Sequence, residues 1–188
     1  MRRRSLIALF LGFALLVQAS PEARSFRQKL GLIRSGKAPR GSRVTIRQNE
    51  LNAFVQDAIA GRVRQGVREP RLELLGGDRA MGSAYVDFPK LRQAMGQPMN
   101  WALVKLLAGE RDVRVYAQIR SGGGRAQVDL DRVEISGLAI SGRALDYLIR
   151  NFVWPYYPNA KVGKPFELDY RIDRLEVQPT QVNVVFGR

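Results

Sequence analysis

Hydrophobic residues recur along this chain with two periods, which predict helices and strands in turn. A short strand at residues 44–46 precedes a helix that Asn49 can cap and Gly66 can end. A second helix follows Ser141 and stops before Pro155. Apolar residues recur every three or four positions in both helices. The two apolar stripes are Leu51, Phe54, Val55 and Ile59 in the first helix, and Leu145, Leu148, Ile149 and Phe152 in the second.

Alternation of apolar and polar residues predicts antiparallel strands around these helices. A hairpin covers 71–88, a longer pair joins 113–119 to 126–135, and a closing hairpin covers 166–186. The alternation changes phase between Leu130 and Val133, which predicts a β-bulge, and again before Leu175. Residues 89–108 are predicted to form two short helices.

These elements predict an α+β fold in a single domain. Two phase changes indicate a strongly curved sheet, and a long curved antiparallel sheet can wrap amphipathic helices and leave an apolar groove. The small residues Ala80, Gly82 and Ala84 share one strand face and leave room there for a bulky group.

The N-terminus has the three-part pattern of a secretory signal. Arginines at 2–4 precede an apolar run at 6–17 and a Val17-Gln18-Ala19 cleavage pattern. The run is about 18 Å long as a helix, whereas the hydrocarbon core of a bilayer is about 30 Å thick. We expect 1–19 to be a signal peptide cleaved after Ala19, and the protein to be periplasmic or extracellular. An uncleaved anchor is the alternative.

Residues 20–43 form a basic leader before the domain at 44–188. Glycines and a proline interrupt it, so a long helix is not expected. The leader is therefore predicted to be a solvated tether, or a segment that lies on an anionic membrane surface. Its cations are Arg24, Arg27, Lys29, Arg34, Lys37, Arg40 and Arg43.

The chain contains neither cysteine nor histidine, which excludes most site chemistry. Zinc, copper and haem need imidazole or thiolate ligands, and Ser-His-Asp or Cys-His catalysis needs histidine. Asp129 and Asp131, and the closing strand's Glu167, Asp169 and Asp173, could perform acid-base chemistry or bind calcium. The interleaved arginines favour cross-strand salt bridges instead. We predict no catalytic residue, metal or cofactor, and therefore no enzyme; a hydrolase is the remote alternative.

The charge is strongly positive. The formal net charge is +14, and loss of the three arginines at 2–4 lowers it to +11. Outside the cytosol the anionic partners are phospholipids, lipopolysaccharide phosphates and acidic polymers, so we predict no nucleic-acid partner. An arginine-rich surface without a specific partner is the alternative. Membrane or head-group contacts are predicted for an aromatic and cationic cluster, unless its rings pack in the core: Arg150, Trp154, Tyr156, Tyr157, Lys161 and Lys164.

Three short motifs resemble small exported bacterial proteins with a tubular lipid-binding (TULIP-like) fold, including the LmeA-type and YpmS-type families. The first runs from Val44-Thr45-Ile46-Arg47 into Glu50-Leu51-Asn52-Ala53. The second is Val133-Glu134-Ile135-Ser136-Gly137, which enters the helix at 144–152. The third is a lysine-glycine-proline turn before the closing hairpin. The resemblance spans about 44–186, except for 89–108. It implies a half-barrel sheet around a helix with acyl chains in the groove, and no catalytic residues.

We therefore predict a lipid-binding protein of the cell envelope, active in lipid transport or homeostasis. Acyl chains of a phospholipid or similar ligand would lie against the two helical stripes, unless those stripes form the domain's own core. The alternative function is a non-enzymatic envelope interaction module, whose basic surface binds an anionic polymer or a partner protein.

Overall fold

The computed structural model describes residues 20–62, 66–94, 96, 107–153 and 162–187, with side chains left out at 58–62. Three expectations fall outside these residues. They are the signal peptide, the second short helix expected within 89–108, and the positions of Trp154, Tyr156, Tyr157 and Lys161. These expectations stay predictions.

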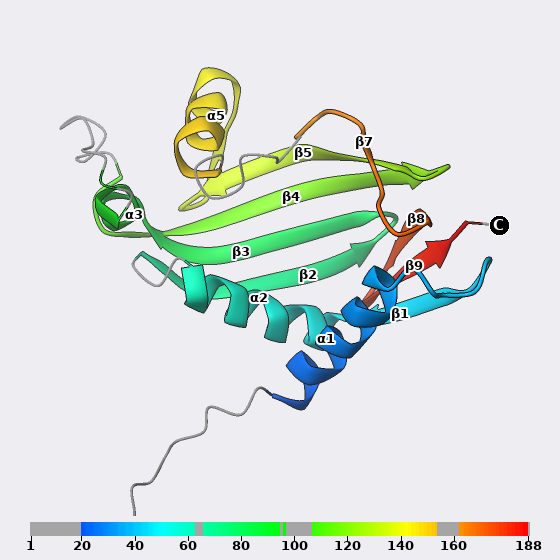
Figure 1. Cartoon of the computed structure of the whole chain (residues 1–188). Helices are drawn as coiled ribbons and strands as arrows, with labels where there is room; N and C mark the ends of the chain where they lie inside the picture. Colours follow the sequence, from blue (N-terminus) through cyan, green and yellow to red (C-terminus); the bar gives the residue numbers. More distant parts are fainter. Residues whose placement is uncertain (1–19, 63–65, 95, 97–106, 154–161, 188) are drawn as a thin grey trace, which may run out of the picture.

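The larger of two antiparallel sheets has the strand order β2-β3-β4-β5-β6, and it does not close into a barrel (Figure 1). A two-residue strand, β7 (Phe166–Glu167), also pairs with β5. The α+β class and the large antiparallel sheet are thus confirmed. Its main strands are β2 (Val67–Gly76), β3 (Arg79–Asp87), β4 (Glu110–Gly122), β5 (Arg125–Ile135) and β6 (Leu138–Ile140).

The smaller sheet brings the first strand of the chain together with its last two strands. β1 (Arg43–Arg47) and β8 (Ile172–Gln178) flank β9 (Gln181–Phe186). The two sheets meet where Gly76 approaches Pro179: a Cβ atom on this glycine would lie 2.8 Å from Pro179 Cδ. Its φ of +79° also favours glycine. The close approach therefore explains the glycine at the end of β2.

The phase changes in the sequence correspond to irregular pairing. Tyr116 pairs with Arg132 while Ala117 pairs with Leu130, which leaves Asp131 as the extra residue of a bulge. The predicted bulge is confirmed. A second shift lies between Ile172 and Arg174 in the β8–β9 pair.

The predicted strand from 166 to 172 is wrong in its middle. Tyr170 and Arg171 have φ values of 58° and 60°, which lie in the left-handed region and break an extended strand. The regular alternation of side chains across this segment concealed a tight turn.

The leader is also different from the prediction. Residues Pro21–Arg34 form a helix, α1, so the expectation of a non-helical tether is wrong there. Ser20 Oγ accepts a hydrogen bond from the Ala23 amide at 3.1 Å, and Pro21 stands at the first helical position. Phe26 and Ile33 are buried against β1 and β9, so tertiary packing outweighs the cost of Gly31.

The other helices occupy different parts of the large sheet (Figure 1). α2 (Gln48–Arg62) runs along the β2 edge, whereas α5 (Gly142–Leu148) lies over the β5 end. A π-helical turn, η1 (Ile149–Val153), continues α5, and α3 (Phe88–Ala94) follows β3. Ser141 is the N-cap residue of α5, but its side chain makes no capping hydrogen bond.

Candidate functional site

An apolar cavity of about 390 Å³ lies between the large sheet and the α5–η1 helix. Strand register places Val113 opposite Ile135, and Val115 opposite Val133, so these side chains share one face of the sheet. The helical residues face them from the other side. The lining residues are Val67, Val86, Phe88, Leu91, Val113, Val115, Leu130, Val133, Ile135, Leu145, Leu148, Ile149, Phe152, Val153 and Val162.

The stripe of the second predicted helix lines this cavity. Leu145, Leu148, Ile149 and Phe152 all belong to the lining, as their three- and four-residue spacing requires if one helix face meets the sheet. Phe152 packs edge-on against Phe88, with ring centroids 5.0 Å apart. Half of the residues predicted for a lipid groove are therefore brought together.

The stripe of the first predicted helix lies elsewhere. Phe54 stacks on Phe26 of α1 with ring centroids 4.4 Å apart, and Leu51 packs on the core between α1 and the small sheet. Val55 is half-buried in α2 and is not among the lining residues, and the side chain of Ile59 is outside the described residues. Because α2 follows the sheet edge, the described part of its stripe does not line the cavity.

One cationic side chain lies against the cavity lining, and two others are close to lining residues in sequence. The Arg92 guanidinium of α3 lies 6.0 Å from the Phe152 ring centroid and donates a hydrogen bond to Asn151 Oδ1 at 3.2 Å. Arg150 is exposed on η1 beside Ile149. Lys164 is exposed two residues after Val162. Arg92 was missed from the sequence, because its segment gave no clear periodicity.

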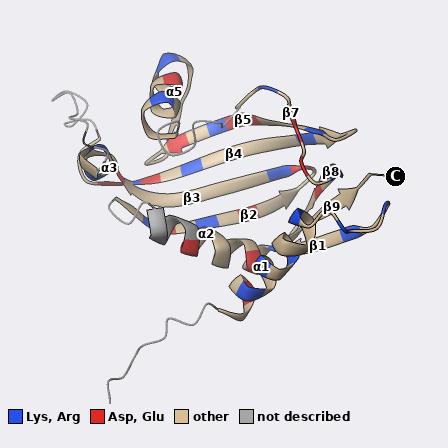
Figure 2. Cartoon of the chain, in the orientation of Figure 1, with Lys and Arg blue, Asp and Glu red and all other residues tan. Residues whose placement is uncertain are grey.

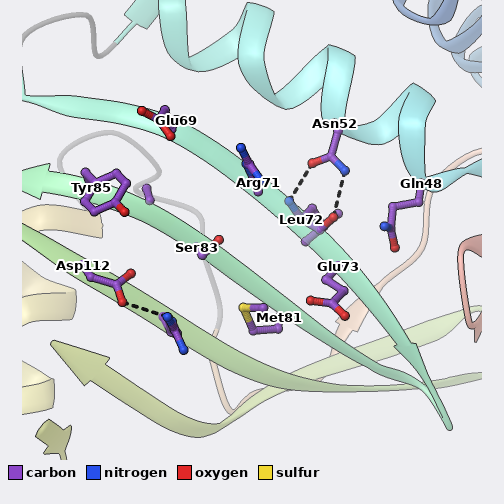
Figure 3. A pocket seen from close by; sticks show the side chains of 12 residues that line it. Gln48, Asn52, Glu69, Arg71, Leu72, Glu73, Met81, Ser83, Tyr85 and Asp112 are labelled. Carbon is purple, nitrogen blue, oxygen red and sulfur yellow. Dashed lines mark hydrogen bonds and ion pairs between the residues drawn. The ribbon is translucent and has the colours of Figure 1, made fainter. Parts of the chain in front are cut away.

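A second hollow, of about 530 Å³, lies on the opposite, polar side of the sheet beside α2 (Figure 3). Its charges are mixed: Glu69, Glu73 and Asp112 alternate with Arg71 and Arg114. Arg114 forms an ion pair with Asp112 at 3.1 Å. These groups offer neither a uniform charge nor an apolar bed to a ligand.

Two of the five carboxylates that could have served catalysis, Asp129 and Asp173, are paired with arginines. Asp129 forms an ion pair with Arg120 and accepts a hydrogen bond from Gln127 at 2.8 Å. The Gln127 hydrogen bond, and then the Arg120 contact, lower the pKa of Asp129. Asp173 likewise pairs with Arg174 at 2.9 Å. Figure 2 shows blue and red residues interleaved along these strands. Within the described ranges, no cluster of three acidic side chains could bind a metal ion.

Comparison of the chain with protein-family models, curated proteins and solved structures finds no match. None of the helices in the described part of the chain is long and apolar enough to cross a membrane.

Proposed function

We propose that this protein binds the acyl chain of a lipid in the cavity between the large sheet and α5–η1. The proposal rests on a cavity of about 390 Å³ whose lining residues are almost all apolar. Small-molecule sites are typically about 300–1,000 Å³ and mostly apolar.

Simple transfer energetics favour a hydrocarbon ligand. Burial of one CH₂ group contributes roughly 0.8 kcal/mol, so several methylenes against Val115, Leu130 and Leu148 would give useful affinity. The cavity is partly open to the surface and its lining is almost wholly apolar, so water inside it finds few polar partners. A curved sheet wrapping the helix, as in TULIP-like proteins, would provide such a site.

The cations near the lining support a polar head group at the mouth. The Arg92 guanidinium lies near the lining ring of Phe152, Arg150 and Lys164 are close in sequence to the lining residues Ile149 and Val162, and guanidinium groups suit phosphate and carboxylate oxygens. Together with an exported location, these features would make the protein a lipid carrier of the cell envelope.

The test is native mass spectrometry of the full chain purified without detergent, before and after incubation with oleic acid. Val115→Trp fills the cavity from β4, whereas Gln118→Trp adds the same side chain to the opposite face of the same strand. We expect bound lipid in the wild-type protein and in Gln118→Trp, and at least a tenfold smaller bound fraction in Val115→Trp.

Two results would contradict the proposal. One is a clean apo mass that does not change after incubation with oleic acid, which would favour the interaction module. The other is wild-type binding by a folded Val115→Trp variant, because the ligand would then lie outside the cavity. Circular dichroism of both variants shows whether they are folded.

A further inference from the structure

A second feature lies at the end of the molecule where α1 connects to β1. Arg34, Lys37 and Arg40 are all exposed there, and none of them forms an ion pair with a described residue. Neighbouring cations differ, since Lys29 pairs with Glu50 and Arg43 pairs with Glu176. This connection, residues 34–40, therefore carries three uncompensated positive charges.

The connection is held firmly in place. Ala38 is only 2% exposed and belongs to the core cluster of α1 and β9. The Arg171 guanidinium donates hydrogen bonds to the carbonyls of Gly36 and Ala38, the second at 3.1 Å. The Gly41 amide donates to the Phe186 carbonyl at 3.2 Å. The three cations therefore belong to a backbone segment that these contacts hold in place.

The turn that supplies Arg171 has an unfavourable sequence. Tyr170 and Arg171 both adopt left-handed conformations, and the Ile172 amide donates to the Asp169 carbonyl at 3.2 Å. This is a type I′ turn, which normally contains Asn-Gly. The strained turn leaves Tyr170 45% exposed beside the connection.

We infer that this surface, formed by Arg34, Lys37, Arg40 and Tyr170, docks on a bilayer that contains anionic phospholipids. Successive cations are three residues apart, so their Cα atoms are at most about 11 Å apart. This is close to the Debye length of roughly 8–10 Å, so the three cations act together on one anionic surface. Tyrosine favours the membrane interface. A soluble polyanion would use the cations but not Tyr170.

The inference does not depend on the cavity. Its test is co-sedimentation with phosphatidylcholine vesicles, with and without 30% phosphatidylglycerol (roughly the anionic fraction that gives a clear surface potential). The variant Arg34→Gln/Lys37→Gln/Arg40→Gln is compared with Arg71→Gln/Arg79→Gln/Arg143→Gln, which loses the same charge elsewhere on the exposed surface. We expect about a hundredfold weaker binding to the anionic vesicles in the first variant, about fivefold per cation, and a much smaller change in the second.

A further substitution separates docking from folding. Asparagine tolerates the left-handed conformation better than tyrosine, so Tyr170→Asn should raise the melting temperature while it weakens vesicle binding. Equal losses in the two triple variants, or binding to soluble polyphosphate with vesicle binding insensitive to Tyr170→Asn, would overturn the inference. Val115→Trp should bind vesicles normally, so failure of the lipid-cavity proposal can be recognised separately.

Discussion

At the scale of single residues, two amide side chains on α2 protect the open edge of the large sheet. Asn52 donates a hydrogen bond to the Leu72 carbonyl at 2.9 Å and accepts one from the Leu72 amide at 2.6 Å. Gln48 accepts one from the Leu74 amide at 2.8 Å. Gln48 and Asn52 are four residues apart, about 6.0 Å along the helix, and Leu72 and Leu74 are two residues apart, about 6.6 Å along the strand. The two amide side chains therefore reach alternate residues of the strand edge. An exposed edge that could pair with another chain is thereby covered.

Replacement of Asn52 by alanine should destabilise the protein by about 1–3 kcal/mol, because the amide and carbonyl of Leu72 lose their partners in a half-buried place. Urea unfolding followed by circular dichroism measures this change. Gln56→Ala, on the same helix at an exposed position, is the control and should change stability by less than about 0.5 kcal/mol. Equal effects of the two substitutions would mean that the edge contacts contribute nothing.

Glu50 is a buried carboxylate that ties α1 to the start of α2. It accepts hydrogen bonds from the Arg47 amide and from Lys29 Nζ, each at 2.7 Å, and from the Ser25 hydroxyl. Burial acts to raise the pKa of Glu50, but these hydrogen bonds outweigh it and leave the pKa below its ordinary value. As the third helical residue, Glu50 caps the helix start by accepting a hydrogen bond from Arg47, the residue before the helix; the predicted cap at Asn49 is wrong, because Asn49 lies inside α2.

A lowered pKa in the folded state stabilises the protein above the unfolded-state pKa of about 4.3, and this stabilisation disappears as the pH falls through the folded-state pKa. Glu50→Gln should therefore be less stable at pH 7 and should lose less stability than the wild type on acidification. Chemical unfolding at pH 7, 5, 4 and 3 tests this. Parallel pH profiles for the two proteins would exclude the role of Glu50.

At the scale of elements, α1 shows how packing decides a segment whose local signals are weak. Its basic residues and glycine predict little helix, yet Phe26 is 6% exposed and stacks on Phe54. The charged side chains lie outside and the few apolar ones lie inside, which is enough for an amphipathic helix on an existing core. In contrast, α5 and the β4–β5 pair have strong local patterns, and the structure confirms them.

Phe26→Ala should destabilise the domain by about 3–5 kcal/mol, the usual cost of removing a buried aromatic ring. A tether would tolerate this substitution, so the result separates the two descriptions of residues 21–34. Thermal or urea unfolding provides the measurement, and Leu32→Ala at the exposed face of the same helix is the matched control. A change below about 1 kcal/mol for Phe26→Ala would indicate that α1 does not contribute to the folded core.

At the scale of the whole molecule, the two proposed lipid contacts lie at opposite ends of the large sheet. The turn with Tyr170 is held near the β4–β5 hairpin, since Gly124 donates to the Asp173 carbonyl at 2.9 Å. The cavity lies near the other end of β5, where Val133 and Ile135 line it. The β1–β9 pairing joins α1 and the closing hairpin into one support for the docking surface.

A ligand that binds the folded state alone raises its stability by mass action. Oleic acid at about a hundred times its dissociation constant should contribute about 2.7 kcal/mol, which corresponds to roughly 5–10 °C in the melting temperature of a chain of this size. Differential scanning fluorimetry measures the shift. Val115→Trp should show none, whereas Gln118→Trp should shift like the wild type; a shift in Val115→Trp would place the ligand elsewhere.

The sequence by itself determined the α+β class, the long β4–β5 pair with its bulge at Asp131, and the α5 stripe, because these features follow from local periodicity. Tertiary structure alone decided that α1 is a helix, that Asn52 covers a sheet edge, and that Tyr170 and Arg171 form a tight turn. It also divided the two apolar stripes between a cavity and the α1–α2 contact. The physical reason is that a periodic pattern shows which side chains will be buried, whereas their partners depend on contacts between residues far apart in the chain.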